Sequence, residues 1–67
     1  MEKLIIFKKT TLKDALQRMD EVGRKLLVVA EDDGTFFSLL SIGDIQRAII
    51  SNKSLTTQVI NILRNKV

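Results

Sequence analysis

The sequence has no cysteine, no histidine and no proline, and its aromatic residues are limited to three phenylalanines. Without cysteine the chain can form neither disulfides nor thiolate metal sites. Without histidine it lacks imidazole ligands and the most common general base. The sequence also shows no pairing of carboxylates and no nucleophile–base arrangement that would support catalysis. We therefore expect no enzymatic activity, no metal site and no required cofactor in this chain.

Positive charge is present, but it is dispersed. The chain carries 11 basic and 8 acidic residues, for a net charge of +3, and its longest basic runs are the pairs at 8–9 and 24–25. Proteins that bind single-stranded nucleic acid combine basic grooves with rings on which bases stack, and rings are scarce here. A small basic nucleic-acid-binding domain remains an alternative, but we expect solvated charges and no nucleic-acid partner.

The chain is short and uninterrupted. Its 67 residues suffice for one small domain, 1–67, and no linker rich in glycine or serine divides it. A domain of this size has a thin margin of stability, so association with another chain or domain is expected to strengthen it. No apolar run approaches the roughly 20 residues of a membrane span, and residues 1–7 lack the features of a signal peptide. We expect a cytoplasmic protein with no membrane partner.

The clearest predicted element is a helix that follows Thr10 and Thr11, either of which can cap it. Thr11 and Asp14 have the spacing of a capping box, with aspartate in place of glutamate. Gly23 stands where a left-handed residue ends a helix. The apolar residues recur at the spacing of one helical face: Leu12, Ala15, Leu16, Met19 and Val22. We expect Leu12, Leu16 and Met19 on the inner face.

Three strands and a second helix complete the predicted fold. Short apolar runs at 4–7, 26–30 and 35–40 favour strands, and residues 31–34 (EDDG) favour a hairpin turn over a calcium loop. Ser41 and Asp44 favour the start of a helix whose buried stripe is Ile45, Ala48 and Ile49. Residues 59–63 predict a short helix or a connecting segment. The order is strand, helix, strand, strand, helix, and one apolar sheet face is left for a neighbour.

Three segments resemble the CBS motif, named after cystathionine β-synthase. Residues 11–19 (TLKDALQRM) are similar to the family pattern T-L-x-x-A-L-x-x-M, residues 26–29 (LLVV) to L-P-V-V, and residues 38–45 (SLLSIGDI) to G-h-h-[ST]-x-x-D-h, where h is apolar. Leu27 and Ser38 stand where the family has proline and glycine. The resemblance covers nearly the whole chain. It implies an α+β fold: a single CBS motif, β-α-β-β-α with a three-stranded sheet, that pairs as a dimer.

A closer resemblance lies in residues 43–55 (GDIQRAIISNKSL). This segment is similar to a stretch of the CBS pair that precedes the catalytic domain of some bacterial sugar-phosphate nucleotidyltransferases. The likeness implies that the chain is the first CBS motif of a longer enzyme. It also implies that the chain is a regulatory module, while the catalytic domain lies elsewhere in the parent protein.

The family resemblance also implies a partner and a ligand. CBS motifs pack in pairs, so the partner would be a second CBS motif in a homodimer or in the parent chain, and we expect helices at this interface. Adenosine nucleotides bind in the cleft between paired motifs, which makes AMP, ADP, ATP or S-adenosylmethionine the candidate ligands. The alternative is a purely structural module that dimerises without ligand.

The resemblance assigns roles to five residues. Asp44 would accept hydrogen bonds from both ribose hydroxyls, Ser41 would donate its hydroxyl to a phosphate oxygen, and Arg47 would add positive charge there. The backbone around Phe7 and Lys8 would seat the base. The chemistry is sound, but Ser41 and Asp44 also have the spacing of an ordinary helix-capping pair, which needs no ligand.

Overall fold

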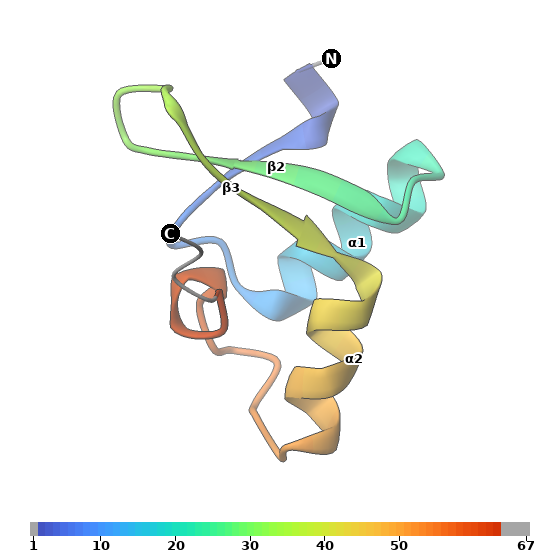
Figure 1. The fold of residues 1–67 in the computed structure, drawn as a ribbon. Coiled ribbons are helices and arrows are strands. Elements are labelled where there is room, and N and C mark those ends of the chain that lie inside the picture. Colours follow the sequence, from blue (N-terminus) through green and yellow to red (C-terminus); the bar gives the residue numbers. More distant parts are fainter. Residues whose placement is uncertain (1, 64–67) are drawn as a thin grey trace.

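The computed structural model describes residues 2–63, so the predicted domain 1–67 extends beyond the described residues at both ends. Five main elements and two single turns of 3₁₀ helix follow one another along the chain (Figure 1). They are η1 (Glu2–Leu4), β1 (Ile5–Phe7), α1 (Leu12–Val22), β2 (Leu26–Ala30), β3 (Phe36–Ser41), α2 (Ile42–Ile50) and η2 (Val59–Asn61). This is the predicted strand–helix–strand–strand–helix order in an α+β fold.

The three strands form one mixed sheet in the order β1-β2-β3. β1 and β2 are parallel, because α1 carries the chain back between them, and β2 and β3 form an antiparallel hairpin. Leu27 pairs with Leu40, and both side chains are fully buried. The register between β2 and β3 shifts between Val29 and Ala30 of β2, where β3 contains one extra residue.

Local hydrogen bonds set the ends of α1 at the predicted residues, although only one of the two bonds of the Thr11–Asp14 capping box is formed. The backbone N–H of Asp14 donates to Thr11 Oγ1 over 3.2 Å, and Gly23 adopts a left-handed conformation with φ of 67°. The inner face differs in part from the prediction. Leu12 and Met19 are buried as expected. Leu16 packs against the core but is only partly buried, whereas its neighbour Ala15 is fully buried.

The hairpin and α2 agree with the prediction except at Ile49. The Glu31 N–H donates to the Thr35 carbonyl across the turn, and Gly34 has a φ of 91°, which favours glycine. In α2, Ile45 and Ala48 are buried, but the prediction for Ile49 is wrong. Its side chain is 46% exposed, because it lies at the edge of the buried stripe, in the last turn of the helix.

The core lies between the sheet and the two helices, which both cover the same face (Figure 1). Its buried members are Ile6, Leu12, Ala15, Met19, Leu27, Val29, Leu40, Ile45, Ala48 and Val59. Phe37 packs against this core, while its neighbour Phe36 lies on the opposite side of the sheet, 65% exposed.

No element among residues 2–63 covers the second face of the sheet, which we call the open sheet face. Strand alternation and register place seven apolar residues on it: Ile5, Phe7, Leu26, Val28, Ala30, Phe36 and Leu39. Four of them are exposed large side chains, namely Phe7, Leu26, Phe36 and Leu39. An apolar surface of this kind indicates a binding partner.

Candidate functional site

Ser41 is the last residue of β3 and the N-cap of α2, and it forms a complete capping box with Asp44. The Asp44 N–H donates to Ser41 Oγ over 3.1 Å, and the Ser41 N–H donates to Asp44 Oδ2 over 2.9 Å. These two bonds satisfy N–H groups that a helix start would leave free. They leave the Ser41 hydroxyl hydrogen and Asp44 Oδ1 available for other partners.

Arg47 lies one helical turn after Asp44 and binds its second oxygen. Arg47 Nη2 donates to Asp44 Oδ1 over 2.6 Å, and the arginine side chain is 63% exposed against 29% for the carboxylate. Partial burial raises the pKa of Asp44, but the hydrogen bonds from Ser41 and Arg47 and the positive charge of Arg47 outweigh it. The net effect holds the pKa below the ordinary value of 3.8. Asp44 is therefore ionised at neutral pH.

The depressed pKa predicts how stability responds to acid. Asp44 has a lower pKa in the folded chain than in the unfolded chain, so its contribution is present above the unfolded pKa and disappears as pH falls through the folded one. At pH 7, Asp44→Asn is expected to lower the free energy of unfolding by about 0.5–1 kcal/mol, since the amide can still cap the helix but carries no charge. Thermal melts of both proteins between about pH 7 and pH 2 should show this gap closing in acid. A gap that is the same at every pH would contradict the ion-pair geometry.

Gly43 lies between Ser41 and Asp44 and is close to the side chains of Ser41 and Arg47. A Cβ atom built on Gly43 would lie 3.5 Å from Arg47 Nη1 and 3.6 Å from Ser41 Oγ. A guanidinium nitrogen and a hydroxyl therefore lie on the same side of residue 43, at ordinary contact distance from the position where a side chain would begin. The sequence analysis missed this residue, because a glycine within a capping box has no distinctive pattern.

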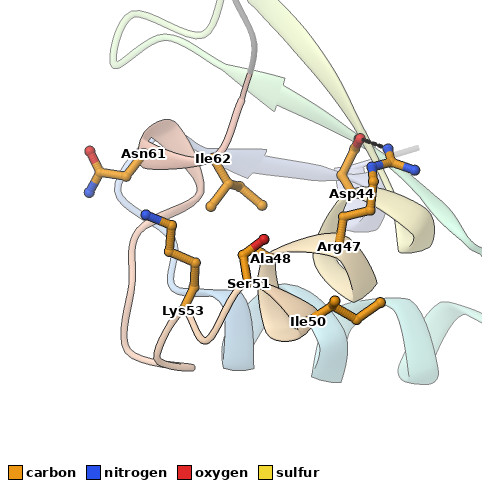
Figure 2. Close-up of a pocket in the computed structure, with 8 residues that line it drawn as sticks. All are labelled: Asp44, Arg47, Ala48, Ile50, Ser51, Lys53, Asn61 and Ile62. Atoms are coloured by element: carbon orange, nitrogen blue, oxygen red, sulfur yellow. Dashed lines mark hydrogen bonds and ion pairs between the residues drawn. The ribbon is translucent and has the colours of Figure 1, made fainter.

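A groove of about 380 Å³ lies beside α2, between this helix and η2 (Figure 2). It is lined by Asp44, Arg47, Ala48, Ile50, Ser51, Lys53, Asn61 and Ile62. Its lining residues come from α2, from the segment after α2 and from η2, so they are far apart in the sequence. Ser51, Lys53 and Asn61 were missed by the sequence analysis for this reason.

Phe7 and Lys8 are not brought together with Ser41 and Asp44. Phe7 pairs with Ala30 at the end of β2, whereas Ser41 pairs with Leu26 at its start. Four residue steps at about 3.3 Å each separate the two positions by about 13 Å along the strand. The backbone segment near Ser41 is instead the start of β2; the Ile42 N–H, for example, donates to the Lys25 carbonyl over 2.9 Å.

Lys8 has partners of its own at its end of the sheet. Lys8 Nζ lies 2.8 Å from Glu31 Oε1 and 5.3 Å from the centre of the Phe37 ring. The hydrogen bond to Glu31 is the main cause that raises the pKa of Lys8 above its ordinary value. These contacts tie the end of β1 to the hairpin turn.

Comparisons with known proteins identify the fold but no family by sequence. No family model and no curated protein matches the chain. Ten chains of solved structures match it. The CBS domain protein PAE2072 from Pyrobaculum aerophilum, complexed with AMP, superposes with a TM-score of 0.80 at 18% identity, over 87% of this chain and 46% of that one. The chain has the fold of a single CBS motif.

A second CBS-fold match is OpuCA of Staphylococcus aureus, with a TM-score of 0.76 at 21% identity, over 94% of this chain and 50% of that one. The chain thus spans about half the length of these two structures. Within residues 2–63, no helix has the length and apolar character needed to cross a membrane.

Proposed function

We propose that this chain is a regulatory CBS module that binds an adenine nucleotide, with Asp44, Ser41 and Arg47 as the contacting side chains. The observation that carries the proposal is the presentation of these three side chains together at the start of α2, in a fold that one structural neighbour has in complex with AMP. The parent protein we propose is a larger cytoplasmic enzyme, a sugar-phosphate nucleotidyltransferase, on the likeness of residues 43–55.

The geometry of Asp44 suits a ribose. A carboxylate only accepts hydrogen bonds, and each of its oxygens can accept more than one. Asp44 Oδ2 is held by the Ser41 N–H, which fixes the plane of the group, and Oδ1 faces the exposed guanidinium of Arg47. A pair of neighbouring hydroxyls can therefore bind a carboxylate whose orientation is already set before the ligand arrives.

The partner that we propose is a second CBS motif, supplied by another copy of this chain or by the parent protein. The two matched structures are about twice as long as this chain, which leaves room in each for a second unit of the same size. The open sheet face offers four exposed large apolar side chains. We propose this face as the interface, in place of the helices expected from the sequence.

A second candidate function is a structural pairing module without ligand. The specific observation in its favour is the completeness of the capping box, which alone accounts for a serine and an aspartate at this spacing. Both functions use the same fold and the same partner. They differ in whether the chain binds a nucleotide with measurable affinity.

Calorimetric titration separates the two candidates. AMP, ADP, ATP and S-adenosylmethionine are titrated into the wild-type chain, and at least one is expected to bind. Asp44→Asn is expected to weaken the binding of that ligand by about ten- to a hundredfold, because a hydrogen bond to a charged group contributes roughly 1.5–3 kcal/mol. Ser41→Ala, which removes one neutral donor, should weaken it several-fold.

Gln46→Ala is the matched control, since Gln46 is an exposed neighbour on α2 outside the groove. No binding of any of the four compounds at millimolar concentration would leave the structural module as the function. Equal binding by wild type and Asp44→Asn would show that the ribose contact has been assigned to the wrong residue.

A further inference from the structure

We propose that Arg18 closes the free edge of β1 and so prevents copies of this chain from joining strand to strand. In the sheet order β1-β2-β3, β1 lies at one edge and pairs with β2 on one side. The free edge of a strand presents N–H and C=O groups with which a strand of another chain can pair. This inference involves none of the three side chains proposed to contact a nucleotide, and it holds whether or not the chain binds one.

The composition of β1 favours strand addition. Residues 4–7 (LIIF) are apolar, uncharged and mostly β-branched or aromatic, with no proline. Segments of this kind assemble into stacked sheets when their edge is exposed. Lysines at positions 3, 8 and 9 flank the run, and flanking charges oppose such assembly. Because these charges lie outside the run, the backbone groups within it need partners of another kind.

The outward backbone groups of β1 find these partners within the same chain. Neighbouring strand residues direct their backbone groups to opposite sides, so Ile5 and Phe7 share one side. The Phe7 N–H donates to Thr10 Oγ1 over 3.2 Å, and the Phe7 carbonyl accepts from the Thr10 N–H over 3.0 Å. Arg18 Nη1 donates to the Lys3 carbonyl over 3.1 Å and, more weakly, to the Ile5 carbonyl over 3.4 Å. One arginine nitrogen thus occupies two carbonyls with which an added strand would pair.

Arg18 lies on α1 and reaches the edge of β1 across a groove of about 330 Å³. The groove is lined by Ile5, Ile6, Phe7, Thr10, Asp14, Gln17, Arg18 and Glu21. Glu21, one helical turn after Arg18, places its Oε1 3.6 Å from Arg18 Nε. The guanidinium holds its nitrogens in a rigid planar fork, so this contact through Nε helps to fix Nη1 on the strand. Arg18 therefore fills the position that a neighbouring strand would take.

The experiment replaces Arg18 with methionine and follows assembly of the chain. Arg18→Met keeps an unbranched side chain that favours a helix but removes every donor. Lys13→Met is the matched control, because Lys13 is an exposed cation on the same helix outside the groove. Thioflavin T fluorescence and light scattering are recorded at about 100 μM, within the range in which unpaired strand edges aggregate. Arg18→Met is expected to assemble at least about tenfold faster than wild type, and Lys13→Met at the wild-type rate.

Two further variants separate edge protection from a general loss of stability. Ile45→Val shortens a fully buried side chain of α2 and lowers stability, while leaving the groove beside β1 unchanged. It is expected to assemble less than about threefold faster than wild type. The double variant Arg18→Met/Ile5→Lys adds a charge to the edge strand, which opposes strand addition but does not stabilise the fold. It is expected to return to the wild-type rate.

The results decide between the two causes of assembly. Rapid assembly of Arg18→Met that Ile5→Lys reverses supports edge protection by Arg18. The proposal is wrong if Arg18→Met stays in solution as long as wild type, if Ile45→Val assembles as fast, or if the double variant assembles as fast as Arg18→Met or faster. Assembly that follows unfolding of Arg18→Met gives the last of these results, because a second substitution in β1 would not restore the fold. Nucleotide binding is measured separately by calorimetry, so it can fail or succeed independently.

Discussion

Replacing Leu40 with alanine is expected to remove much of the chain's free energy of unfolding at 25 °C. Leu40 is fully buried in β3 and pairs with Leu27, which is fully buried as well. Truncating a buried leucine costs roughly 2–5 kcal/mol, because apolar contacts are lost and a cavity remains. The total stability of a domain of this size is about 5 kcal/mol. Urea unfolding followed by circular dichroism measures the loss directly.

Leu55→Ala is the matched control for this prediction. It removes the same atoms from a leucine that is 43% exposed in the segment after α2, so its free energy of unfolding should stay within about 0.5 kcal/mol of wild type. Similar losses in both variants would show that the core of the sheet is placed wrongly. A stable Leu40→Ala variant would show that β3 is out of register by one residue.

A lysine at Leu39 is expected to abolish self-association while the chain stays folded. Leu39 is 46% exposed on the open sheet face, next to Val28 on the central strand. If two copies pair through this face, the new ammonium group would be buried without a partner, which is costly. We expect the dissociation constant of the pair to rise by at least about a hundredfold, equivalent to about 2.7 kcal/mol. Sedimentation equilibrium near 10 μM, roughly a usual working concentration, measures it.

Ile50→Lys tests the competing interface. Ile50 is 78% exposed at the end of α2, on the helical side of the molecule. This variant should dimerise as wild type does if the sheet faces meet. If Ile50→Lys dissociates the dimer and Leu39→Lys does not, the two copies pair through their helices, as predicted from the sequence. A wild-type chain that sediments as a folded 7.6 kDa monomer would contradict both proposed interfaces.

Local patterns in the sequence were enough to predict the elements and, to within one or two residues, their ends. Thr11, Gly23 and Ser41 act through hydrogen bonds and backbone conformations that involve only residues within a few positions along the chain. Helical spacing identified Leu12 and Met19, and alternation in a strand placed Phe36 and Phe37 on opposite faces. The capping pair of Ser41 and Asp44 was predicted for the same reason, since both partners lie in one turn.

The groups that meet from distant parts of the chain could not be predicted from local patterns. The strand register placed Phe7 and Lys8 at the far end of the sheet from Ser41, and the packing of α2 left Ile49 exposed. The groove between α2 and η2 likewise brings together residues that are far apart in the sequence. Periodicity tells which face of an element is apolar, but register and packing are fixed by contacts between residues far apart in the chain, and these leave no local pattern.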